Sequence, residues 1–218
     1  MSKYKLVIFD MDGTLADTSP GILNCIRYTI KKMGLNEISL EQMYSHVGPP
    51  MEESYNRNFG LTGDSLKQAV SHHKEYAIQK GFKELKLYDG VLPLIDAIRK
   101  NGIKTAVATL KAHDTILKIF DSLEISDKFD IVFGVSQDNP MAKAQLLNCC
   151  IKEIGIEPFE AVLIGDSKYD AIGAMETGID FIAVTYGFGF KSASDVEQYP
   201  HVCVCDSVKE IEQFILPE

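Results

Sequence analysis

Uninterrupted apolar runs recur along the chain, and such runs predict strands that are covered on both faces in a parallel sheet. Between the later runs lie amphipathic segments with helical spacing, for example Ala142 to Ile154 and Ala171 to Glu176. The alternation of the two patterns predicts an α/β chain with a doubly wound parallel sheet. The apolar runs are Leu6 to Phe9, Ile103 to Ala108, Ile131 to Val135, Ala161 to Ile164 and Phe181 to Thr185, and Cys203 and Cys205 mark a late strand.

The first apolar run is separated from the second by a stretch that shows mainly helical patterning. Glycines and prolines divide this stretch, among them Gly34 and Gly48-Pro49-Pro50, and such residues end helices. The spacing therefore predicts an inserted helical domain at residues 17–82, with residues 1–16 and 83–218 forming the main domain. The helices expected in the insertion are Ile22 to Met33, Leu40 to Val47, Met51 to Phe59 and Leu66 to Gln79.

Two further helices are expected in the main domain. Leu92 to Lys100 has helical spacing and is followed by Asn101-Gly102, which ends it. Near the end of the chain, Ser207-Val208-Lys209-Glu210 predicts a capping box that opens a last helix reaching Ile215.

Composition narrows the possible functions. The chain has 218 residues, of which 45% are hydrophobic and 24% are charged, as in ordinary globular proteins. Its net charge of −9 argues against a nucleic-acid partner, because such binding depends on clustered lysine and arginine. We see no signal-peptide pattern and no apolar run near the roughly 20 residues of a membrane span, so we expect a cytoplasmic protein without a membrane partner. Nothing in the pattern specifies an oligomeric state.

Cysteine and histidine do not indicate a metal site. The five cysteines are odd in number and form no Cys-x-x-Cys pair, so they predict reduced, mostly buried thiols. The histidines show no metal-binding spacing, and the pair His72-His73 is expected on a solvated helix surface.

The first apolar run ends in two carboxylates, in the segment Asp10-Met11-Asp12-Gly13-Thr14. Side chains at positions i and i+2 of an extended segment point the same way, so those of Asp10 and Asp12 can converge. Two interpretations fit this segment alone. It is either an Asp-Gly turn after a strand or a site in which two anions share a cation.

Polar residues also follow the later strands, and ligands bind at the carboxyl ends of the strands in an open parallel sheet. The second apolar run ends in Thr109, Lys143 lies in the helical segment after the third, and Asp166 follows the fourth. Asp170 fits either a site or a capping box with Ser167. The conjunction of these residues in this order favours a site over unrelated turns, caps and solvated lysines.

In these motifs the sequence resembles the haloacid dehalogenase superfamily, over nearly the whole chain. The resemblance implies a Rossmann-like core with a helical cap, and a magnesium-dependent phosphatase that acts on a small phosphorylated metabolite. Later segments are similar to phosphoglycolate-phosphatase-like members of that superfamily. The matching segments are Asp10-Met11-Asp12-Gly13-Thr14, Thr109, Lys143, Gly165-Asp166-x-x-x-Asp170, Gly173-Ala174, Gly178-Ile179-Asp180 and Tyr186-Gly187-Phe188-Gly189.

The resemblance implies that the two carboxylates of the first motif divide the chemistry. Asp10 would be the nucleophile that forms an aspartyl phosphate. Asp12 would protonate the leaving oxygen and then deprotonate the attacking water. Dehalogenases of the superfamily lack this second carboxylate, so Asp12 argues for phosphate chemistry.

The remaining motif residues would bind metal and phosphate. The resemblance implies that Mg²⁺ is held by Asp10, by Asp166 and by the main-chain carbonyl of Asp12. Asp170 would orient a bound water or the lysine from behind the site. The groups expected to hold the phosphoryl oxygens are Thr109, Lys143 and main-chain amides near Met11 and Asp12.

The helical insertion would act as a cap that closes over the site and reads the leaving group. Residues expected to line the closed pocket are His46, Gly48, Pro49, Pro50 and Met51. Two departures from related phosphatases bear on the substrate: the segment Asp138-Asn139-Pro140-Met141-Ala142-Lys143 lacks an arginine, and Lys74 stands where arginine is common. Phosphoglycolate and nucleoside 5′-monophosphates are the substrates that we consider.

Three other classes use similar residues. A non-hydrolytic phospho-acceptor such as a receiver domain has its aspartate after a middle strand and no helical insertion of this size. A phosphomutase shares the core, but Thr14-Leu15 is more similar to the hydrolytic branch. A phosphonoacetaldehyde hydrolase needs a Schiff-base lysine from the cap, where Lys31 and Lys32 are available.

Overall fold

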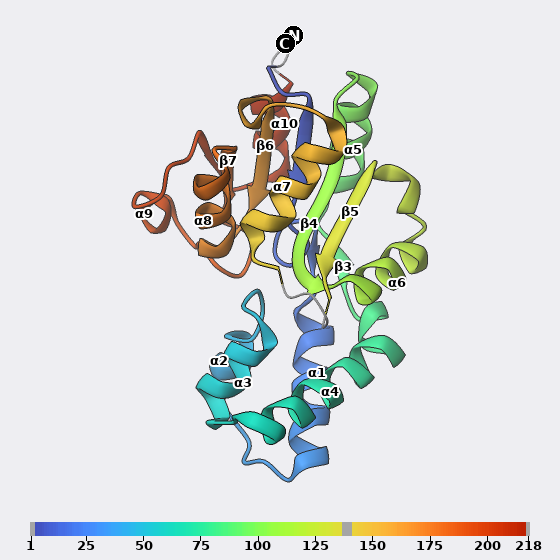
Figure 1. Cartoon of the computed structure of the whole chain (residues 1–218), viewed down its shortest axis with the longest axis vertical. Helices are drawn as coiled ribbons and strands as arrows, with labels where there is room; N and C mark the ends of the chain where they lie inside the picture. Colours follow the sequence, from blue (N-terminus) through green and yellow to red (C-terminus); the bar gives the residue numbers. More distant parts are fainter. Residues whose placement is uncertain (1–2, 137–140, 217–218) are drawn as a thin grey trace.

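The computed structural model describes residues 3–136 and 141–216. In this part of the chain a six-stranded parallel sheet has the strand order β5-β4-β1-β6-β7-β8 (Figure 1). The predicted doubly wound α/β fold is confirmed. The strands are β1 Leu6–Phe9, β4 Lys104–Ala112, β5 Ile131–Val135, β6 Ala161–Gly165, β7 Asp180–Val184 and β8 Cys203–Cys205.

Helices cover both faces of the sheet, which explains why β1 is apolar at every position. Val7 and Phe9 belong to one hydrophobic cluster, and Leu6 and Ile8 belong to another on the opposite face. Alternate side chains of a strand point to opposite faces, so a strand in the middle of such a sheet has no face left for water. The first face is covered by α5 Val91–Lys100, α6 His113–Leu123 and α10 Val208–Ile215, and the second by α7 Lys143–Ile154 and α8 Lys168–Thr177.

Four helices between β1 and β4 form a separate layer, which we call the four-helix unit: α1 Ser19–Met33, α2 Leu40–Tyr44, α3 Met51–Phe59 and α4 Gly63–Gln79. It has hydrophobic clusters of its own, one around Ile26 and Val47 and one around Tyr55. A short antiparallel pair, β2 Ala16–Asp17 with β3 Lys86–Leu87, connects it to the rest of the chain. Figure 1 shows the unit beyond the end of the sheet toward which the arrows of β4 and β5 point.

Several details differ from the expectations, among them the end of α2 at Tyr44 rather than Val47 and the end of β4 at Ala112 rather than Ala108. Helix α6, which packs on the sheet through Ile116 and Phe120, was not predicted. The capping box at Ser207 was wrong, because Ser207 makes no side-chain cap and Glu210 Oε2 instead accepts from the backbone N–H of Asp206 at 2.9 Å. Helices α1 and α4 begin three residues earlier than expected, because their first turns hold polar residues and glycine.

Two expectations about composition can be compared with the structure. As predicted, all five cysteines are free thiols, and three of them are buried. Within residues 3–136 and 141–216, the helices are all too short or too polar to cross a membrane.

Candidate active site

Asp10 directly follows β1, at the carboxyl end of this strand. Its backbone N–H still donates to the carbonyl of Ile164 on β6 at 2.9 Å, and its side chain is buried. Lys143, the first residue of α7, places Nζ 2.6 Å from Asp10 Oδ1, 2.8 Å from the carbonyl of Ala108 and 2.7 Å from Asp170 Oδ1. The lysine expected to bind phosphate is therefore a buried cation between two carboxylates, rather than a solvated helix residue.

Asp166 follows β6 and is held by the loop after β7. Its Oδ2 accepts hydrogen bonds from the backbone N–H groups of Phe188 at 2.6 Å and Gly189 at 3.0 Å. A Cβ atom at Gly13 or at Gly187 would overlap this carboxylate oxygen. Gly13 also has a φ of 78°, which other residues rarely adopt. The two glycines thus let two chain segments close around the Asp166 side chain.

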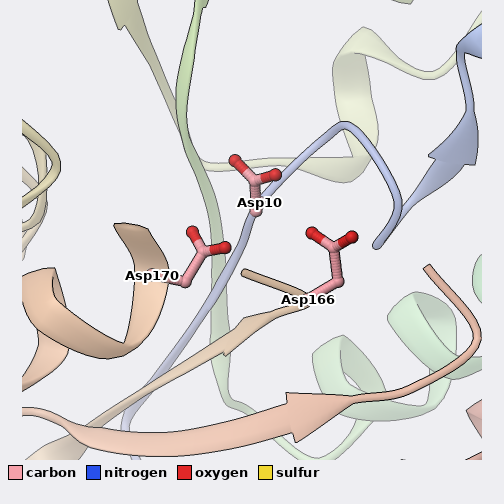
Figure 2. Close-up of side chains that lie close together, drawn as sticks. All are labelled: Asp10, Asp166 and Asp170. Atoms are coloured by element: carbon pink, nitrogen blue, oxygen red, sulfur yellow. The ribbon is translucent and has the colours of Figure 1, made fainter. Parts of the chain in front are cut away.

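Asp10, Asp166 and Asp170 form a cluster in which one oxygen from each lies within 4.8 Å of the others (Figure 2). Burial raises the pKa of Asp10 to about 7 against the attraction of Lys143, and it raises the pKa of Asp166 to about 8 with help from the neighbouring carboxylates. When all three are ionised, their one ammonium partner leaves an excess of two negative charges. Buried carboxylate oxygens with this excess are what a hard divalent cation such as Mg²⁺ requires.

The carboxylate of Asp12 is not part of this cluster and has partners of its own. Its Oδ1 accepts a short hydrogen bond from the hydroxyl of Thr18 and lies 3.1 Å from Lys111 Nζ. The side chain of Asp12 is therefore positioned for a role other than metal ligation. The sequence analysis did not include Lys111 among the site residues. Its position two residues after Thr109 on the same strand could have indicated it, because side chains at positions i and i+2 of a strand point the same way.

The other residues expected to hold phosphate differ in what they offer. Thr109 is buried at the edge of the cavity, and its Oγ1 accepts from the backbone N–H of Lys111 at 3.3 Å. The side chain of Met11 is fully buried in the core, and its carbonyl accepts from the backbone N–H groups of Leu15 and Ala16. A phosphate contact from Met11 would therefore come from its main-chain amide.

A cavity lies between these strand ends and the four-helix unit. Four of the five residues expected to line a closed pocket do so, and Pro50 instead precedes α3 as its N-terminal flanking residue. The segment Asp138 to Pro140, where the arginine of related phosphatases is absent, lies outside the described residues. The side of the four-helix unit contributes Ile22, His46, Gly48, Pro49, Met51, His73, Lys74 and Ala77 to the lining, and the sheet side includes Asp10, Asp12, Thr109, Lys111, Lys143, Tyr169 and Asp170.

Two histidines of the four-helix unit are buried beside this cavity. The expectation that His73 is solvated was wrong: it is 7% exposed, and its Nδ1 lies 3.0 Å from the hydroxyl of Tyr55, because α4 turns this residue toward α3. His46 is 5% exposed, and its ring centroid lies 5.1 Å from that of Tyr55. Burial lowers the pKa of His46 to about 4 and that of His73 to about 3. Both rings are neutral at physiological pH.

We expect acidification to destabilise the protein through these two histidines. In the unfolded chain they titrate near 6.5, whereas in the folded protein their pKa values are about 4 and about 3. The unfolded state therefore binds more protons as the pH falls below 6.5, and the free energy of unfolding decreases until the folded values are reached. The measurement is the midpoint of thermal unfolding, Tm, from about pH 7.5 to about pH 4.5.

The test compares the wild type with the double variant His46→Gln/His73→Gln. The variant His201→Gln is the control, since His201 is exposed. On acidification, the Tm of the double variant should decrease less than that of the wild type. The Tm of the control should decrease as much as that of the wild type. The same loss in all three proteins would contradict the assignment of buried neutral histidines.

The fold and these side chains define an α/β protein with its ligand site at the carboxyl ends of parallel strands, facing an inserted layer of helices. A family model for haloacid dehalogenase-like hydrolases matches residues 7–184. The chain belongs to this family of hydrolases.

Several proteins similar to this chain carry specific names. The tyrosine-protein kinase PtkA of Mycobacterium tuberculosis is 31% identical, over 94% of this chain and 72% of that protein. A 5′-nucleotidase of Pseudomonas aeruginosa is 27% identical, over 92% and 91%. A phosphoglycolate phosphatase of Nitrosospira multiformis is 32% identical, over 84% of each. Among solved structures, a haloacid dehalogenase-like hydrolase of Streptococcus pneumoniae has a TM-score of 0.89 and 30% identity, covering 98% of this chain and 99% of that one.

Proposed function

We propose that this protein is a magnesium-dependent phosphomonoester hydrolase that works through an aspartyl phosphate on Asp10. The observation that carries the proposal is the buried arrangement of Asp10, Lys143, Asp166 and Asp170 at the carboxyl ends of the strands. Membership of a hydrolase family and the names of two phosphatase relatives support it.

The residues present fit a magnesium ion. Asp10 and Asp166 would hold it with side-chain oxygens, and the main-chain carbonyl of Asp12 would be a further ligand. Asp170 would not bind the metal directly, and it would instead position Lys143 through their ion pair. When bound, Mg²⁺ neutralises the charge on the phosphoryl oxygens, so that a carboxylate can approach them.

The chain's own residues would divide hydrolysis into two displacements. An Asp10 oxygen attacks phosphorus, the bond from phosphorus to the ester oxygen breaks, and Asp12 gives its proton to that oxygen. Asp12 then takes a proton from water as the water attacks the phosphoaspartate, which releases inorganic phosphate and regenerates Asp10. Lys143, Thr109 and the Met11 amide would stabilise the charge on the transferring group.

The four-helix unit would act as a cap, with the boundaries predicted at residues 17–82. Its residues form one side of the cavity, so a leaving group held there is shielded from water. A hydrogen bond of 2.8 Å from the Tyr169 hydroxyl to Glu53 Oε2 joins the sheet side to α3 beside the cavity. Specificity for the leaving group would depend on this side of the cavity.

The substrate would be a small phosphorylated metabolite. Phosphoglycolate is one candidate, supported by the 32% identical phosphatase, and a nucleoside 5′-monophosphate is the other, supported by the 27% identical nucleotidase. A cytoplasmic location agrees with either substrate.

We expect removal of divalent metal to abolish turnover and Mg²⁺ to restore it. The protein would be treated with EDTA, dialysed, and assayed for phosphate release from a panel of small phosphomonoesters with and without Mg²⁺. Loss of at least about 100-fold without metal is expected, because the excess negative charge of the cluster then repels the substrate. Calcium serves as a control cation, since its looser coordination supports less turnover.

Full activity after exhaustive chelation would contradict the metal assignment.

Because one relative is named a tyrosine-protein kinase, the panel includes ATP with a tyrosine-containing peptide. Phosphate transfer to the peptide without steady release of phosphate from any monoester would contradict the hydrolase proposal.

A further inference from the structure

The two sides of the cavity differ in charge. The sheet side carries both signs of charge: it is lined by the carboxylates of Asp10, Asp12 and Asp170 and by the ammonium groups of Lys111 and Lys143. On the side of the four-helix unit, the described lining residues include Lys74 and two neutral histidines but no acidic residue. Lys111 reaches into the same cavity from the end of β4. The lining from the four-helix unit is therefore positive, and Lys111 lies in the same cavity as Lys74.

Lys74 is a partly buried ammonium group without a close anionic partner. It lies on α4 beside the cavity, and within the described part of the chain it forms no ion pair. Burial lowers its pKa, and Glu52 opposes this only from a distance. An ammonium group that loses water without gaining a carboxylate costs free energy, and a ligand anion would remove that cost.

Lys111 can bind more than its present partner. Its side chain is 13% exposed, and Nζ lies 3.1 Å from Asp12 Oδ1. An ammonium group has three N–H donors, and Asp12 Oδ1 can take only one of them. This oxygen also accepts a hydrogen bond from the hydroxyl of Thr18. Lys111 therefore has donors for a second anion on the cavity side.

His46 provides a third and independent observation. The side chain is 5% exposed, it lines the cavity, and its Nε2 is buried without a hydrogen-bond partner. A buried polar atom left without a partner is uncommon and costly, and it points to a ligand that supplies the missing bond. A neutral imidazole with its proton on Nε2 can donate that bond to an oxygen anion.

We propose that Lys74, Lys111 and His46 form a subsite for an anionic group on the leaving part of the substrate, either a carboxylate or a second phosphate. The inference rests on the proposed phosphatase function and specifies its substrate class. An uncharged leaving group such as a nucleoside would occupy the cavity while leaving Lys74 without an anionic partner and Lys111 with Asp12 alone. The subsite selects instead a compact phosphomonoester whose leaving group carries an anionic group of its own.

The experiment compares substrates that differ by one anionic group. The first pair is 2-phosphoglycolate and 2-phosphoglycolamide, in which a neutral amide replaces the carboxylate. The second pair is ethylene glycol bisphosphate and 2-hydroxyethyl phosphate, which has a neutral leaving group. The readout is the ratio of kcat/KM for the charged member to that for the neutral member. The wild type should prefer the charged member of at least one pair by about tenfold or more, since charge-assisted hydrogen bonds discriminate to this extent. Which pair shows the preference distinguishes a carboxylate from a second phosphate.

The variants Lys74→Met and Lys111→Met keep the apolar stem and remove the charge. Each should reduce the preference to within about threefold, mainly through a higher KM for the charged substrate. Lys67→Met is the matched control, because Lys67 lies on α4 with its side chain 81% exposed, and it should keep the wild-type ratio. Thermal unfolding of each variant verifies that it is folded.

The failures are distinguishable. Phosphate release from both members of each pair at similar kcat/KM, or a preference that survives in both lysine variants, overturns the subsite and leaves the phosphatase function intact. The absence of phosphate release from these four substrates and from an aryl phosphate overturns the proposed function, and the subsite with it.

Discussion

Replacing Asp10 with asparagine should abolish phosphate release while leaving the protein folded. Asparagine has nearly the same shape but cannot form the covalent aspartyl phosphate, so kcat should fall by at least about 1,000-fold. The fold should survive because Lys143 keeps a carboxylate partner, Asp170 Oδ1, at 2.7 Å. Removal of one charge from a crowded anionic cluster should change the free energy of unfolding by less than about 2 kcal/mol. The measurements are steady-state phosphate release and denaturant unfolding.

The intermediate can be tested separately from turnover. Brief exposure of the wild type to a ³²P-labelled substrate, followed by denaturation, should leave label on the chain, and Asp10→Asn should carry none. Asp12→Asn should release phosphate slowly from the labelled chain, because the group expected to activate water is missing. Asp96→Asn, on the exposed side of α5, is the control and should behave as the wild type. Label on Asp10→Asn equal to that on the wild type would move the nucleophile to another residue.

The part of the fold that sequence could predict is the part set by local patterns. β1 and β5 have the predicted bounds, because each is a short apolar run: β1 is buried at every position, as a strand covered on both faces requires, and β5 is partly buried at the edge of the sheet. The carboxylates that follow β1 and β6 were identified for a related reason: in a parallel sheet, residues after different strands meet at one edge whatever their separation along the chain. The structure brings Asp10 and Asp166 together across more than 150 positions.

The contacts that sequence could not predict depend on which surfaces meet. His73 has the same helical spacing whether its side of α4 faces water or Tyr55, and only packing against α3 decides between them. Helix α6 has apolar residues at helical spacing, including Ile116 and Phe120, but it follows β4 directly, and no glycine or proline marks the boundary between them. The contact of Lys111 with Asp12 joins two strand ends and required the register of the sheet.

Lys143 is a buried cation that serves two carboxylates of the site, Asp10 and Asp170. Burial by itself would lower its pKa, but the attraction of Asp10 and Asp170 outweighs burial and raises it, so the ammonium form persists. A Cβ atom at Gly173 would meet the stem of this lysine at 2.5 Å from Cγ, so the side chain is confined as well as paired. Such a residue holds Asp10, the proposed nucleophile, in place and also reduces repulsion inside the cluster.

Replacing Lys143 with methionine should therefore cost both stability and activity. Methionine keeps the length of the stem but leaves Asp10 and Asp170 buried, at 7% and 1% exposure, without their cation. Without metal, we expect the free energy of unfolding to decrease by about 3–5 kcal/mol, as for other buried ion pairs that lose one partner. Phosphate release should fall by at least about 100-fold, because the same charge also stabilises the transferring group.

Magnesium distinguishes this electrostatic explanation from a simple packing defect. If Lys143 neutralises the carboxylates, a saturating divalent cation should return part of the lost stability to Lys143→Met, and more than it adds to the wild type, since it then meets a less compensated cluster. Lys104→Met is the matched control: Lys104 pairs with Asp130 across a surface where its side chain is 55% exposed, so its loss should cost less than about 1 kcal/mol. A stability loss in Lys143→Met that is unchanged by Mg²⁺ would mean that the side chain acts mainly through packing, and the cluster would then need another source of compensating charge.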